Sequence, residues 1–165
     1  MQALSAEKAL QSSENALKVT QRAWVGVTAA QLDAPFNPKE LIGARATITN
    51  TGPSPALNMT ATLAMVVKND YPLPDDFEMP QPRFPVHSST NLMSGVVAPM
   101  HLVPNAEIAA TFRERPAKVH VYILGKIEYT DIFGDRHTTR YCYFRFEDEP
   151  PGTEIHSCKT WNSMD

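Results

Sequence analysis

The stretch KVHVYILGKIEYTDIFGDRHTTRYCYFRFE, residues 118–147, decides the fold. Two segments rich in β-branched and aromatic residues, 118–131 and 136–147, flank the turn Ile132-Phe133-Gly134-Asp135. Asp and Gly are the residues that a tight turn requires, and the turn lacks the ligand spacing of a calcium loop. We therefore read Asp131, Asp135 and His137 as residues of a turn. The stretch predicts a long antiparallel hairpin.

The register of this hairpin stays open at the level of sequence. Side chains alternate between the two faces of a strand, so a slip of one residue reverses every face. The apolar face of the first strand lies opposite one of two sets in the second strand. One set contains Cys142, Phe144 and Phe146, and the other contains Tyr141 and Tyr143. Either set fits the buried face.

The same alternation recurs upstream of the hairpin. Residues 24–32, 41–49 and 106–114 each predict a strand, and Asn50-Thr51-Gly52-Pro53 predicts a turn. Residues 56–68 predict a longer strand, or two strands joined by a bend. Its inward-facing side chains are Leu57, Met59, Ala61, Leu63, Met65 and Val67. About seven strands without intervening helices predict an all-β, immunoglobulin-like antiparallel sandwich over residues 22–165.

Residues 1–21 differ from the rest in composition. They contain no Gly or Pro and are rich in Ala, Leu, Glu, Lys and Gln, which predicts a helix. A stripe at heptad spacing consists of Ala3, Ala6, Leu10, Ser13, Leu17 and Thr20. The stripe is weak because most of its members are small. A surface helix and a stalk or coiled-coil partner both remain as interpretations.

The segment 69–104 contains seven of the fourteen prolines and predicts a long loop with at most one short strand, around Val96-Val97. Its aromatic residues Tyr71, Phe77 and Phe84 either cover one edge of the sandwich or form an apolar patch for a protein partner. Its Met and His side chains are weak candidates for copper ligands, because thioether and imidazole suit that metal. These candidates are Met79, His87, Met93, Met100 and His101.

Charge and motifs exclude several function classes. The formal net charge of −3 and the lack of a basic run argue against binding to nucleic acid or to an anionic membrane surface. No nucleophile elbow and no cysteine paired with a base is present in the sequence. We expect a protein that is not an enzyme, requires no cofactor and binds a protein partner. The alternative is a copper-handling protein that uses the Met and His residues of the 69–104 segment.

The residues themselves do not indicate the cellular compartment. No apolar run approaches the roughly 18 residues of a membrane helix, and the first residues do not resemble a signal peptide. Read alone, this pattern fits a cytosolic protein. The two cysteines, Cys142 and Cys158, are either two inert thiols or one disulfide that closes a loop of about 15 residues, worth about 3 kcal/mol.

Three blocks together resemble a known family. They are residues 21–25 (QRAWV), 49–56 (TNTGPSPA) and 125–142 (GKIEYTDIFGDRHTTRYC). They resemble an uncharacterised family of small bacterial membrane-anchored proteins with an extracytoplasmic immunoglobulin-like β domain. The resemblance implies a membrane helix before Met1, a juxtamembrane stalk over residues 1–21 and a location on the periplasmic side of the inner membrane. It supports a Cys142–Cys158 disulfide and implies no catalytic residue.

Overall fold

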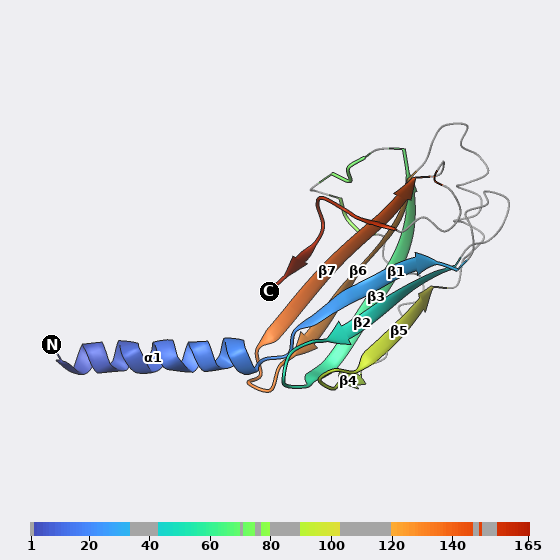
Figure 1. The fold of residues 1–165 in the computed structure, drawn as a ribbon. Helices are drawn as coiled ribbons and strands as arrows, with labels where there is room; N and C mark the ends of the chain where they lie inside the picture. The colour runs from blue at the N-terminus through green and yellow to red at the C-terminus, as the bar shows by residue number, and fades with distance from the viewer. Residues whose placement is uncertain are drawn as a thin grey trace.

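A computed structural model describes residues 2–33, 43–69, 71–74, 77–79, 90–102, 120–146, 149 and 155–165. It confirms one N-terminal helix followed by an antiparallel β-sandwich. The helix is α1 (Gln2–Gln21). It projects away from one end of the sandwich, so that its N-terminus lies far from both sheets (Figure 1). The strand predicted over 106–114 lies outside the described residues.

The smaller sheet has three strands in the order β1-β2-β5. They are β1 (Val25–Leu32), β2 (Ala44–Asn50) and β5 (Val97–Leu102). The larger sheet has the order β4-β3-β6-β7-β8, and β9 also pairs with β7. Its strands are β3 (Ala56–Lys68), β4 (Thr90–Leu92), β6 (His120–Thr130), β7 (Arg136–Phe146), β8 (His156–Ser157) and β9 (Ser163–Met164).

The main core lies between the two sheets and follows the period of two. In β2, Ala44, Ala46 and Ile48 are buried, and Val121 and Ile123 of β6 are buried in the same cluster. Burial of these side chains is what holds the sheets face to face.

A close approach of the β6 and β3 backbones explains one glycine of the core. A Cβ atom at Gly125 would overlap with the carbonyl oxygen of Thr62 and with the hydroxyl of Tyr141. In the hairpin, Gly125 pairs with Tyr141. The Tyr141 ring lies over the position that a side chain at residue 125 would occupy.

The hairpin resolves the open question of which aromatic set is buried, because each set has buried members while Tyr143 and Phe146 are half-buried. Tyr141 lies 3% exposed in the core between the sheets. Cys142 and Phe144 lie 0% and 4% exposed on the opposite face, in a second apolar cluster. The sequence could not indicate this, because an alternating strand normally has one solvated face.

The long strand predicted over 56–68 has the predicted bounds but one wrong assignment. Its ladder shifts register between Ala56 and Thr60, and Asn58 adopts a positive φ of 50°. This bulge turns Leu57 away, so Leu57 is half-buried and Ala56 takes the buried position instead. Asn tolerates this left-handed backbone better than most residues do.

The proline-rich segment 69–104 contains more strand than expected. Both β4 and the six-residue β5 lie within it, so the prediction of at most one short strand is wrong. Pro99 lies inside β5, opposite Thr47 of β2. Proline is compatible with a strand where its missing N–H would face away from the neighbouring strand, so a proline count alone underestimates β structure.

Candidate functional site

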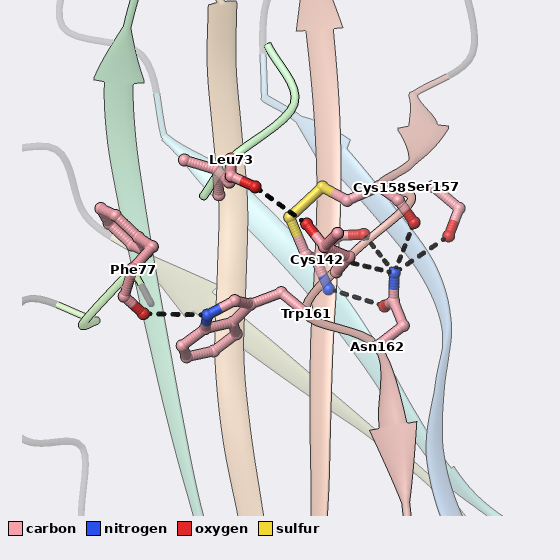
Figure 2. Close-up of a disulfide and its surroundings, with 8 residues drawn as sticks. Leu73, Phe77, Cys142, Ser157, Cys158, Trp161 and Asn162 are labelled. Carbon is pink, nitrogen blue, oxygen red and sulfur yellow. Dashed lines mark hydrogen bonds between the residues drawn. A yellow bond between two sulfur atoms is a disulfide. The ribbon is translucent and has the colours of Figure 1, made fainter. Parts of the chain in front are cut away.

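The outer face of the larger sheet carries a second apolar layer, which we call the outer layer. Its buried members are Leu73, Tyr122, Leu124, Cys142, Phe144 and Cys158, with Phe77, Met79 and Trp161 packed against them. Figure 2 shows the disulfide at its centre, with a Leu73 segment on one side and the C-terminal segment on the other. Cys142 and Cys158 are bonded, with their Cα atoms 5.3 Å apart, as predicted.

The C-terminal segment 155–165 covers the outer edge of β7. β8 pairs with Tyr143 and Phe144, and β9 pairs with Thr139 and Arg140. Between these pairings, the Asn162 side chain takes the place of a strand. Its Oδ1 accepts a hydrogen bond from the Cys142 N–H at 2.9 Å, and its Nδ2 donates to the Cys158 carbonyl at 2.8 Å.

Of the three predicted interaction residues, Phe77 belongs to this outer layer and Tyr71 contacts it. The Tyr71 ring lies 4.6 Å from the Phe144 ring and remains 36% exposed. The Phe77 ring contacts the Trp161 ring edge-on at 6.3 Å, and its carbonyl accepts a hydrogen bond from the indole N–H (Figure 2). Phe84 lies outside the described residues. Tyr71 and Phe77 therefore make intramolecular contacts that cover the sheet.

The predicted copper ligands occupy separate surroundings. Met79 packs in the outer layer, whereas Met100 packs against the main core. His101 lies on the solvent face of β5 and contacts Asp33, and Met93 is exposed in the β4–β5 turn. His87 lies outside the described residues. Among the residues that the structure describes, no three His, Cys, Asp or Glu side chains are grouped as metal ligands.

A shallow groove of about 320 Å³ lies between β1 and β7, and its lining includes Gly26, Tyr141, Tyr143, Asn162 and Met164. Both tyrosine hydroxyls are already engaged: Tyr141 donates to the Thr62 carbonyl at 2.8 Å and Tyr143 to the Val27 carbonyl at 2.9 Å. Burial raises the pKa of both phenols. The lining of this groove contains no carboxylate, imidazole or thiol. Its other hydroxyls belong to Ser163 and to Thr139, which donates a hydrogen bond to the Val25 carbonyl at 2.6 Å.

The last turn of α1 is fixed to the β6–β7 turn. Lys18 Nζ lies 2.9 Å from Asp135 Oδ2 and 5.8 Å from the centre of the Phe133 ring. The hydrogen bond and the charge of Asp135 raise the pKa of Lys18. The Arg22 guanidinium stacks on the Trp24 ring at 3.6 Å. We call this region the joint.

Beneath the joint lies a buried polar network. Asp131 Oδ1 accepts hydrogen bonds from the Phe133 and Asp135 N–H groups, and Asp131 Oδ2 lies 2.9 Å from His137 Nε2. Burial by itself raises the pKa of Asp131, but the hydrogen bonds from His137 and from the two backbone N–H groups outweigh it and lower the pKa below its usual value. The sequence predicted a turn here but not this network.

Exposed apolar side chains gather at the end of the sandwich that carries the joint. Met93, Val96 and Val97 are 56%, 46% and 55% exposed in and next to the β4–β5 turn. The Gly95 N–H donates to the Asn50 carbonyl at the end of β2. Figure 1 shows the β4–β5 and β6–β7 turns at this same end. Ile132 and Phe133 of the β6–β7 turn are also exposed.

Where the structure describes the chain, α1 makes few contacts beyond the joint. Leu10, Leu17 and Val19 of the helix are all more than half exposed. No helix in the described ranges is long and apolar enough to cross a membrane.

No protein-family model, curated protein or solved structure matches the chain.

Proposed function

We propose that this protein is a non-enzymatic, extracytoplasmic interaction module. In this proposal, α1 is a stalk that holds the sandwich away from its attachment point, and the apolar end of the sandwich contacts a protein partner. The observation that carries the proposal is the group of exposed apolar side chains at Met93, Val96 and Val97, within the segment that the sequence marked for interaction. Exposed apolar patches on a soluble domain mark sites of contact.

Two further features support the stalk and the compartment. From residue 5 to its end, helix α1 is exposed except at the half-buried Lys18. Lys18, and Arg22 directly after the helix, attach it to the sandwich. A 20-residue helix is about 30 Å long, so a rigid joint would hold the sandwich at that distance. The Cys142–Cys158 disulfide fits an oxidising compartment such as the periplasm. The resemblance to membrane-anchored bacterial proteins agrees with a tether at the inner membrane.

Site-directed photo-crosslinking in the native host tests the contact surface. A photoreactive phenylalanine analogue replaces Val97 in one variant and Gln31, exposed near the far end of β1, in a matched control. We expect Val97 to yield a discrete crosslinked protein and Gln31 to yield none. Equal adducts at both positions, or none at Val97, would contradict the proposed surface.

The cellular compartment and the attachment to the membrane are tested by a separate measurement. Intact mass of the protein from membrane and soluble fractions, alkylated with and without reduction, reports both. We expect a membrane-retained species with one disulfide between Cys142 and Cys158. A soluble species with two free thiols would overturn the tether and the compartment together.

A further inference from the structure

His137 lies at the joint between groups from separate parts of the chain. Its Nε2 is 2.9 Å from Asp131 Oδ2 in the β6–β7 turn. Its Nδ1 is 3.2 Å from Arg22 Nη1, which follows α1, and 3.7 Å from Asp165 Oδ1. The Tyr129 ring of β6 lies over the imidazole at 5.2 Å. The imidazole itself is 10% exposed.

These partners determine the protonation state of the imidazole. A guanidinium can only donate hydrogen bonds, so Nδ1 of His137 must offer a lone pair to Arg22. Asp131 is held as a carboxylate by its own hydrogen bonds, so Nε2 must carry the proton that it shares with Asp131. The arrangement therefore requires a neutral His137 with its hydrogen on Nε2.

A second proton on His137 would break this arrangement. The new N–H at Nδ1 would point at the Arg22 guanidinium, which sets donor against donor and cation against cation. Asp165 Oδ1 already lies near Nδ1 and accepts a hydrogen bond from the Thr138 N–H at 2.6 Å. It is the acceptor for the imidazolium. His137 thus has one partner for each charge state.

We propose that His137 is a proton-dependent latch for α1: the neutral imidazole holds Arg22 at the joint, and the imidazolium releases it and bonds to Asp165. Histidine is the side chain that ordinarily changes charge between about pH 5 and 8. Within the described part of the chain, the other polar attachment of α1 is the Lys18–Asp135 pair, which is solvent-exposed, and such pairs contribute little to stability. Ala23, directly after Arg22, is buried and stays anchored by the Tyr129 hydroxyl. Release of Arg22 therefore lets α1 change its angle to the sandwich about this fixed point.

The two tryptophans of the chain provide the probes. Trp24 stacks under Arg22, whereas Trp161 lies in the outer layer, so labelling with 5-fluorotryptophan gives one reporter and one internal control. We would titrate the full chain from pH 8 to pH 5. Fluorine spectra would follow the two indoles, and ¹⁵N spectra would follow the His137 ring. We expect the Trp24 resonance to shift with the midpoint of His137, with Trp161 unmoved, and the backbone order of α1 to fall over the same range.

Two variants sharpen the test. His137→Gln keeps a donor and an acceptor but cannot titrate, so it should abolish the Trp24 transition. Asp165→Asn removes the negative charge that stabilises the imidazolium, so it should move the transition to lower pH.

The ¹⁵N spectrum of the wild-type chain needs no variant and decides the question if a substituted chain does not fold. A hydrogen on Nδ1 at pH 8, no His137 titration down to pH 5, or a His137 titration that leaves Trp24 unmoved would each overturn the proposal. A Trp24 transition that persists in His137→Gln would do the same.

Discussion

Removing the disulfide is the perturbation whose size the structure predicts most directly. The double substitution Cys142→Ala and Cys158→Ala opens a loop with a sequence separation of 16 residues. In the chain-entropy description, closing a loop of that length stabilises the folded state by about 3 kcal/mol. For a chain of this length, a loss of about 3 kcal/mol lowers Tm by about 6–12 °C. Lost packing of the two buried side chains acts in the same direction.

Two measurements separate loss of the C-terminal segment from general weakening. Thermal unfolding followed by near-ultraviolet circular dichroism gives the change in Tm. Native-state hydrogen exchange gives the local effect, because the Cys142 and Thr138 N–H groups bond only to side chains of the C-terminal segment. We expect amide hydrogen exchange at the substituted position 142 and at Thr138 to accelerate more than exchange at the amides that pair β7 with β6.

The reasoning would be refuted by a Tm that falls by less than about 3 °C, since that corresponds to about 1 kcal/mol for a chain of this length. It would equally be refuted by unchanged exchange at both outward-facing amides. Either result would mean that the segment stays on β7 without its covalent link.

Three further predictions concern stability. Gly125→Ala should lower the free energy of unfolding, measured in urea, by about 2–3 kcal/mol because a backbone carbonyl blocks the new methyl group. Gly95→Ala is the control: its methyl group enters open space, and the φ of 71° should cost only about 1 kcal/mol. Asn162→Ala should cost about 1–3 kcal/mol by leaving a β7 N–H without its acceptor, and Asn162→Asp, which keeps an acceptor, should cost less. The pKa of Asp131 is lowered in the folded protein. Its contribution to the free energy of unfolding is therefore complete above the unfolded-state pKa of about 3.9 and is lost as the pH falls through the folded-state pKa. Asp131→Asn should therefore lower Tm at pH 7 and make Tm less sensitive to acid below about pH 4, which would be contradicted by parallel Tm–pH curves for the two proteins.

The parts of the fold that sequence predicts well are those in which one local signal decides the outcome. The Ile132-Phe133-Gly134-Asp135 turn and the alternation on either side define β6 and β7, and the run from Ala56 to Lys68 defines β3 with its observed bounds. These elements combine a strong period of two with turn residues at their ends. The helix over the first residues is predicted equally well by composition.

The parts that sequence misses depend on what packs from elsewhere. The bulge at Asn58 has no local signature, and Pro99 hides a strand because its compatibility depends on which side β2 pairs. Burial of Tyr141 and Phe144 on opposite faces requires a layer that comes from residues 71–74, 77–79 and 155–165. The contacts of His137 join α1, a turn and the C-terminal segment, which no spacing rule connects. Partner binding, compartment and family stay predictions.

The cover over β7 also bears on aggregation. An unprotected edge strand presents a row of free N–H and C=O groups on which another chain can add, and β7 is long, regular and rich in aromatic residues. Here residues 155–165 occupy that row with two short pairings and one amide side chain. A version of the protein shortened before residue 155 would retain most of both sheets and yet expose this strand. We therefore expect such a version to accumulate as insoluble, edge-to-edge associated material, with the hairpin itself intact.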